Sequence, residues 1–173
     1  MILGTHFLGE KAVPAQSAPI AETTPAEPAP AASEGMNIII AEDDISIKGL
    51  LTILLDAEMT ASVDQDGDIE ISIDDFTIFV RHVPDKQRLT FMSFADFNKQ
   101  TTSEERLRFC NTINAERVFI KASIVDENPN RLILDHDVST EAGITIYQFI
   151  ALTIRFARAS VFAIEKGEGG ILE

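Results

Sequence analysis

The sequence predicts an α+β domain: one antiparallel β-sheet flanked by helices, in the order α-β-β-β(-β)-α-β-β-α. Three observations lead to this prediction. Apolar residues recur at helical spacing in three segments, the runs between them alternate apolar and polar residues, and turn residues separate those runs closely enough for hairpins. Grouped hairpins beside separate helices indicate an α+β fold rather than a parallel α/β sheet.

Residues 1–35 differ in composition from the rest of the chain. They hold five of the seven prolines and eight alanines. Such a segment buries too little apolar surface to offset the conformational entropy lost on folding. We expect residues 1–35 to be a disordered Pro/Ala-rich tail or linker and residues 36–173 to form a single domain, with Met36 as a candidate start of the folded unit.

The first predicted helix covers residues 44–57, and Asp43 or Asp44 can cap its first amide groups. Its buried face is an apolar stripe at helical spacing, formed by Ile47, Leu50, Leu51 and Leu54.

Short strands follow this helix. Asp66-Gly67 is a strong signal for a two-residue hairpin turn, and Asp74-Asp75 predicts a second turn or a bulge. If residues 68–82 instead form one bent strand, the group has three strands rather than four. The strands are expected at residues 61–65, 68–73, 76–80 and 88–94, with a loop at 83–86.

Two capping boxes mark the remaining helices, one formed by Thr102 with Glu105 and the other by Thr145 with Gln148. The second helix is expected to end near Asn114, and the last to run over residues 146–165. On the second helix, one buried side is predicted to carry Leu107, Cys110 and Ile113.

A final hairpin of residues 117–125 and 131–138 lies between these two helices. Its inward-facing residues must share one side of the sheet, which fixes the register and places Lys121 opposite Asp135 on the outer face. The predicted inward-facing residues are Val118, Ile120, Ala122, Ile124, Leu132, Leu134 and Val138.

Charge and composition exclude several function classes. The net charge of −14 argues against nucleic-acid binding and against docking on anionic membranes. The single cysteine, Cys110, permits neither an intrachain disulfide nor a Cys-rich metal site. The last helix is apolar enough for a membrane check, but Arg155 and Arg158 near its middle would each cost about 2.5–3.5 kcal/mol in a bilayer. We therefore expect a buried helix in a cytoplasmic protein.

Candidate chemistry is weak throughout the chain. Asp135-His136-Asp137 suggests a metal site, but successive strand residues face opposite sides, so the three cannot converge. The acidic run 64–70 fails as a calcium loop, because Gly67 at the sixth position puts Ile73 where a bidentate Glu is needed. We expect no catalytic residue, no metal site and no cofactor, and thus no enzyme.

One resemblance covers residues 44–164. The segment Asn111-Thr-Ile-Asn114-Ala-Glu-Arg117-Val-Phe-Ile-Lys121-Ala resembles the hallmark of the bacterial YbjN family, where two asparagines three apart end a helix and lead into a strand. The hairpin containing Leu132-Ile-Leu-Asp135 and the Gly143-Ile-Thr145 opening of the long helix are also similar to that family. Ile113 departs from the pattern, since an aromatic residue is usual there.

The resemblance implies a fold like that of type III secretion chaperones, which usually pair as homodimers, often through the second helix. It also implies a regulator of sensory transduction with largely undefined molecular activity. The implied structural or partner-contact residues are Asn111, Asn114, Arg117 and Gly143. Asparagine near a helix end tolerates the left-handed conformation and can bond free carbonyls, so a structural role competes with partner contact.

Three functions stay open at this point. The first is a chaperone-like module that binds a protein partner or client, the second a dimeric signalling regulator without a client, and the third a metal-binding protein or enzyme that uses surface carboxylates. The last helix is apolar around most of its circumference. One face of a sheet cannot cover all of that apolar surface, so we expect a homodimer to bury the rest. The residues concerned are Ile146, Phe149, Ile150, Leu152, Ile154, Phe156, Val161 and Ile164.

Overall fold

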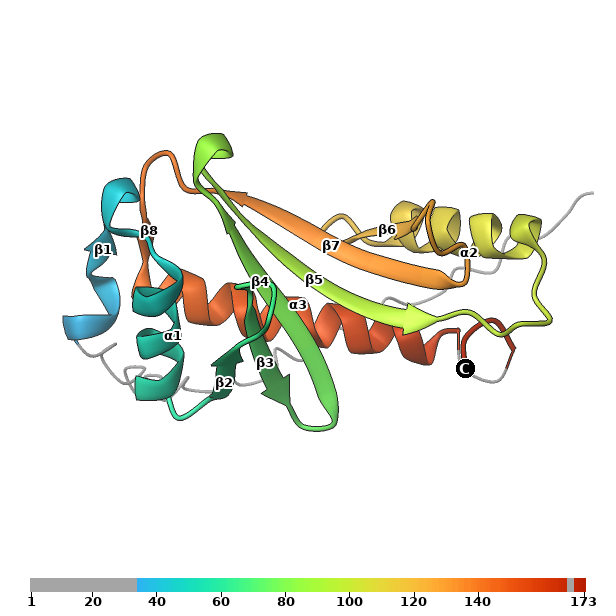
Figure 1. Ribbon diagram of the computed structural model, residues 1–173, viewed down its shortest axis with the longest axis horizontal. Helices are drawn as coiled ribbons and strands as arrows, with labels where there is room; N and C mark the ends of the chain where they lie inside the picture. The colour runs from blue at the N-terminus through green and yellow to red at the C-terminus, as the bar shows by residue number, and fades with distance from the viewer. Residues whose placement is uncertain (1–33, 168–169) are drawn as a thin grey trace, which may run out of the picture. The chain divides into compact units, whose positions relative to one another are not determined.

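The computed structural model describes residues 34–167 and 170–173. The predicted tail lies almost wholly outside these residues. The described part is an α+β unit in which an antiparallel sheet of order β2-β3-β4-β5-β7-β6 packs against three helices (Figure 1). The predicted fold class is confirmed, with four strands between the first and second helices. The helices are α1 (Ile47–Asp56), α2 (Ser103–Glu116) and α3 (Ile146–Glu165).

The six-stranded sheet is built from neighbouring hairpins. Its strands are β2 (Thr60–Val63), β3 (Ile69–Ile73), β4 (Phe76–Val83), β5 (Arg88–Asp96), β6 (Lys121–Ile124) and β7 (Arg131–Ser139). A separate pair, β1 (Ile39–Ile40) with β8 (Ile144–Thr145), joins the start of the described chain to the start of α3. Short 3-10 turns occupy Glu34–Asn37, Glu42–Asp44 and Pro84–Lys86.

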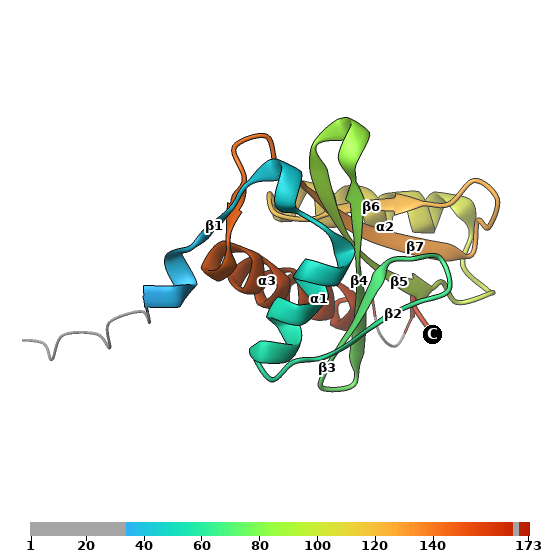
Figure 2. The same ribbon diagram turned by 60° about the vertical axis from the view of Figure 1, so that its left-hand side comes forward.

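The core lies on one face of the sheet, between the strands and the helices. Phe91 of β5 is fully buried, with its ring centroid 6.2 Å from that of Phe149 and 5.9 Å from that of Phe156 on α3. Leu50 and Leu54 of α1 join the same core. Figure 2 shows α1 and α3 on one side of the sheet.

The register of the last hairpin is confirmed. Lys121 lies opposite Asp135, and Lys121 Nζ is 3.9 Å from Asp135 Oδ1. Both predicted capping boxes are also present, at Thr102 with Glu105 and at Thr145 with Gln148. These features depend on residues close in sequence, so they could be predicted well.

The predicted start of α1 is wrong. Asp43 and Asp44 belong to a 3-10 turn, and the helix begins after Ser46. Ser46 has extended backbone angles, and its hydroxyl accepts a hydrogen bond from the amide of Gly49 at 3.2 Å. A hydroxyl in this position caps a helix as well as a carboxylate does.

The predicted two-residue turn at Asp66-Gly67 is also wrong, although the hairpin exists. The connection spans residues 64–68, because the Asp64 carboxylate accepts hydrogen bonds from the amides of Asp66 and Asp68, both at 2.9 Å. This side chain thereby builds the turn. The buried carboxylate of Asp68 then pairs with Arg81, whose Nη2 lies 2.6 Å from Asp68 Oδ2.

Two residues predicted to face inward are exposed instead. Val118 is fully exposed because α2 continues to Glu116 and β6 starts only at Lys121. Leu107 is 56% exposed, and its neighbour Arg106 is buried in its place. The Arg106 guanidinium donates to the carbonyl of Pro129 at 2.7 Å and to Asn130 Oδ1 at 2.6 Å, so it holds the β6–β7 loop against α2.

Helix α1 ends in a Schellman motif with an unusual residue. The amide of Met59 donates to the carbonyl of Leu54 and that of Glu58 to Leu55, both at 3.0 Å. The left-handed position of this motif normally belongs to glycine, yet Glu58 occupies it with φ of 59°. This backbone conformation costs about 1–2 kcal/mol for a residue with a Cβ atom.

We therefore expect Glu58→Gly to raise the free energy of unfolding by about 0.5–1 kcal/mol. This is the backbone strain that glycine relieves, minus the extra conformational entropy that glycine gives the unfolded chain. Urea unfolding at neutral pH measures it. Glu58→Ala is the control, since it removes the carboxylate but keeps the strained Cβ. An equal gain in both variants would assign the effect to charge and contradict the backbone explanation.

Candidate functional site

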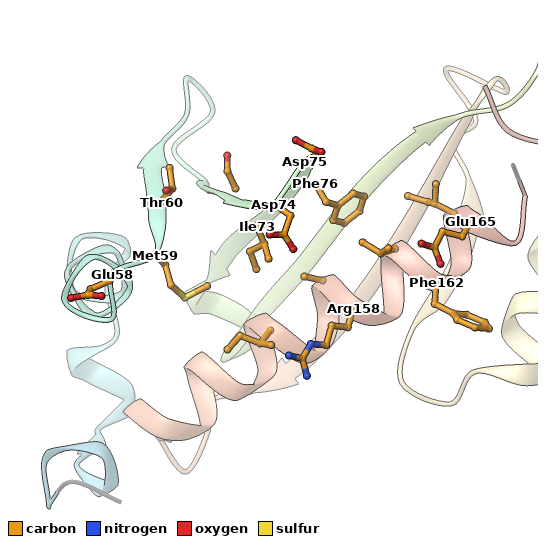
Figure 3. Close-up of a pocket in the computed structure, with 15 residues that line it drawn as sticks. Glu58, Met59, Thr60, Ile73, Asp74, Asp75, Phe76, Arg158, Phe162 and Glu165 are labelled. Carbon is orange, nitrogen blue, oxygen red and sulfur yellow. The ribbon is translucent and has the colours of Figure 1, made fainter.

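A groove of about 1060 Å³ lies between α3 and two turns, the one that joins α1 to β2 and the one that joins β3 to β4 (Figure 3). The first turn presents Glu58 and Met59, and the second presents Asp74 and Asp75. The wall on the other side is the C-terminal half of α3, from Ile154 to Glu165. The groove is partly open to solvent.

The lining of this groove is largely apolar. Phe162 of α3 is 46% exposed, and the Arg117 guanidinium lies 3.7 Å from its ring centroid. That stacking holds the ring in place while leaving it open to a partner. The apolar lining residues are Met59, Ile73, Phe76, Ile154, Ala157, Val161, Phe162 and Ile164.

The groove exists because α3 buries only one side. Phe149 and Phe156, two of the residues predicted to give the helix its apolar excess, are fully buried against the sheet. Ile150, Ile154 and Val161 are only partly covered. The predicted excess of apolar surface on the last helix is thus real but smaller than its sequence suggests.

Carboxylates surround the groove. Glu58, Asp74, Asp75 and Glu165 are all exposed, and the one cation among the lining residues is Arg158. Asp74, like Glu58, has a left-handed backbone, with φ of 53°. Both turns therefore place an acidic residue where glycine fits with less strain. The groove combines an apolar lining with a negatively charged rim.

Helix α3 also meets the length and composition of a membrane span, alone among the helices of the described residues. The burial of its Phe149 and Phe156 against the sheet is what the core helix of a folded domain shows.

A family model identifies the family of this chain. The family model "YbjN: Putative bacterial sensory transduction regulator" matches residues 46–160, which is more than half of the chain. The chain belongs to the YbjN family. No curated protein matches it.

Solved structures show the same fold at low sequence identity. The crystal structure of YbjN from E. coli has a TM-score of 0.64 and 17% identity, covering 75% of this chain and 96% of that one. An uncharacterized protein from Methanothermobacter thermautotrophicus has a TM-score of 0.53 and 12% identity, and the match covers 70% of this chain and 96% of that one. The structure of the HopA1-SchA chaperone-effector complex contains a chain with a TM-score of 0.50 and 14% identity, and the match covers 68% of this chain and 90% of that one.

The second asparagine of the YbjN hallmark closes an edge of the sheet. Asn114 Oδ1 accepts from the amide of Ala122 at 2.7 Å, and Asn114 Nδ2 donates to the carbonyl of Ala122 at 3.0 Å. Since β6 is an edge strand, this carboxamide takes the place of a neighbouring strand. The structural role predicted for Asn114 at the helix end is therefore wrong in detail: it bonds strand groups, not free helix carbonyls, and its φ is not positive.

The other hallmark residues lie in different places. Asn111 is exposed on α2, beside Leu107 and Ala115, so partner contact stays a prediction for it. Arg117 follows α2 and supports Phe162 of the groove. Gly143 has φ of 76°, and a Cβ atom there would lie 2.5 Å from the carbonyl oxygen of Ile40, so only glycine fits beside β1.

The Asp-His-Asp run of β7 does not form a metal site. Asp135 and Asp137 pair with Met92 and Thr90 on the outer face, while His136 pairs with Phe91 on the helix-covered face. In the described residues, no group of three His, Cys, Asp or Glu side chains could hold a metal ion. Burial raises the pKa of Cys110 and of Asp135, the latter opposed by Lys121, and these groups do not meet.

His136 is enclosed by aromatic and cationic neighbours. Its ring centroid lies 4.1 Å from that of Phe119, and the Arg155 guanidinium lies 4.2 Å from the same Phe119 ring. Burial lowers the pKa of His136, and Arg155 adds to the effect, while Asp135 and Asp137 oppose it. The imidazole is therefore neutral in the folded state at neutral pH.

Folding lowers the pKa of His136, so the unfolded chain binds a proton at this residue more readily than the folded protein. The free energy of unfolding is therefore highest above the unfolded pKa, near 6.5 for histidine, and falls as the pH drops toward the folded pKa. We expect His136→Gln to reduce the loss of unfolding free energy between pH 7.5 and pH 5.5, measured by urea unfolding. His82→Gln is the control. An unchanged pH dependence in His136→Gln would show that His136 charges as readily folded as unfolded.

Proposed function

We propose that the chain is a cytoplasmic, non-enzymatic protein-binding module that pairs as a homodimer and holds a segment of a client polypeptide in the groove beside α3. The groove carries this proposal, because it exposes apolar side chains that a monomeric domain would otherwise bury. Its length suits a peptide segment better than a small molecule, and its open side admits a continuous chain.

The relatives support the same kind of activity. The HopA1-SchA structure is a complex of a chaperone with its effector, and its chain shares the fold of this one. The described groups with shifted pKa values lie outside the groove: Arg81 in β4, Glu105 and Cys110 in α2, and Asp135 and His136 in β7. The groove itself offers carboxylates and one arginine without a histidine, cysteine or serine-base pair, so it supports binding rather than catalysis.

Self-association is proposed at a second surface, the N-terminal end of α3. Tyr147 is 54% exposed there, near the exposed Ile38 and the exposed Ile39 of β1, which pairs with Thr145. A shallow hollow between Met36 and Ile154 contains Arg155 and Arg158 but no carboxylate. Two copies that each carry a net charge of −14 repel one another least where their contact surface lacks acidic groups.

A dimeric signalling regulator without a client is the second candidate. The family description as a sensory transduction regulator favours it. The two candidates differ in whether the groove beside α3 has an occupant.

Photo-crosslinking tests the client proposal. A benzoylphenylalanine at Val161 in the groove is expected to crosslink a foreign polypeptide in native cells, and the adduct is expected to disappear in the Ile154→Asp background. Leu107 on α2 is the control position for the crosslinker, with a similar exposed side chain outside the groove. Equal adducts from both positions would favour the regulator without a client.

Sedimentation equilibrium tests the homodimer. We expect twice the 19.0 kDa chain mass at micromolar concentration, unchanged or slightly tighter as salt rises, because screening at about 8 Å weakens the repulsion between acidic chains. Tyr147→Glu is expected to weaken pairing at least about tenfold.

Leu107→Glu on α2 is the matched control for Tyr147→Glu, since both place one new carboxylate on an exposed apolar position. Dissociation by Leu107→Glu alone would move the interface to α2, and a monomer of wild-type protein would refute the homodimer.

A further inference from the structure

We infer that the segment bound beside α3 is a basic amphipathic helix, an inference that rests on the proposed client-binding function. Three properties of the groove lead to it: the length of its wall, the state of its backbone groups and the charge of its rim.

The length fits about three helical turns. The α3 wall runs from Ile154 to Glu165, about 16 Å at 1.5 Å per residue. A helix laid along it would present apolar residues at i, i+3 or i+4, and i+7 to the groove. The apolar residues available to them are Ile154, Val161 and Phe162 of α3 on one side and Met59 and Phe76 on the other.

The backbone of the groove favours a helix over an extended strand. Its longest wall is a helix, whose interior amide and carbonyl groups are bonded within α3 itself. Along the α3 wall an extended segment would find no free interior backbone groups and would leave its own polar groups on that side unpaired. A helical segment bonds its backbone internally and needs only side-chain contacts from the groove.

The charge of the rim selects a basic partner. The lining residues include four carboxylates, Glu58, Asp74, Asp75 and Glu165, and one cation, Arg158. Asp74 and Asp75 are adjacent in sequence and repel each other, so lysine or arginine residues flanking the apolar stripe of a bound helix would relieve that repulsion.

Other occupants are disfavoured by the same charge. A second copy of the chain brings another net charge of −14, and the N-terminal residues 1–33 hold three glutamates against one lysine. Neither complements four carboxylates. An acidic helix would also be repelled.

Two designed peptides of about 18 residues test the inference by fluorescence anisotropy on the full-length protein. Both carry leucine at the helical spacing given above, one with lysine and the other with glutamate on the polar face. We expect the lysine peptide to bind at least about tenfold more tightly. The difference is expected to shrink as the salt concentration rises.

Charge reversal at the rim separates the groove from the overall charge of the protein. Asp75→Lys with Glu165→Lys is expected to weaken the lysine peptide at least about fivefold. Neither residue has a positive φ, so the reversal adds no backbone strain. The matched control is Asp126→Lys with Glu127→Lys in the exposed β6–β7 loop, which changes the net charge equally. Equal weakening by both double variants would overturn the inference.

The apolar lining supplies the last arm. Val161→Asp is expected to abolish binding of the lysine peptide, and the exposed Phe162→Glu replaces it if Val161→Asp lowers the melting temperature. If both peptides bind equally and Val161→Asp abolishes that binding, the basic partner is overturned but the client groove stands. If Val161→Asp leaves peptide binding unchanged, both the basic partner and the client groove are overturned. If the lysine peptide binds only after residues 1–33 are deleted, that segment is the occupant and the inference is overturned.

Discussion

The width of the sheet relative to its helices governs the rest of this structure. Six strands at about 4.8 Å spacing span roughly 24 Å, whereas one helix is about 10 Å across. No single helix can cover the apolar face, so α1, α2 and α3 divide it. Where α3 and the β3–β4 hairpin diverge, apolar side chains such as Phe76 and Val161 keep contact with solvent. The groove is thus a consequence of covering a wide sheet with few helices.

The residues at the edges of this groove reveal a conflict between stability and surface chemistry. The left-handed backbone at Glu58 and Asp74 suits glycine, and the Schellman motif after α1 would form with less strain if glycine were present. Carboxylates occur at both turns instead. Strain of this kind persists where the side chain has a use that the folded state alone does not explain, which agrees with the proposed selection of a basic partner by the rim.

Sequence reasoning succeeded where neighbours along the chain decide the outcome. The capping boxes at Thr102 and Thr145 and the Lys121–Asp135 register follow from local spacing. It failed where a distant group decides: Arg106 is buried because the β6–β7 loop supplies its acceptors, which turns Leu107 outward. The groove could not be predicted at all, because its lining comes from three separate segments that meet only in the folded chain.

Asn114 restricts strand addition at one edge of the sheet. A free edge strand normally invites pairing with any extended chain, but at β6 the Asn114 carboxamide already bonds both backbone groups of Ala122. Strand addition at that point would have to displace an intramolecular partner held by α2. The Asn114 carboxamide occupies the β6 edge at Ala122 and the interior backbone of α3 is bonded internally, whereas the outer edge of β2 is unpaired within the described sheet. Under the proposed function, a client in the groove beside α3 meets apolar side chains and the carboxylates of the rim, which then set the selectivity.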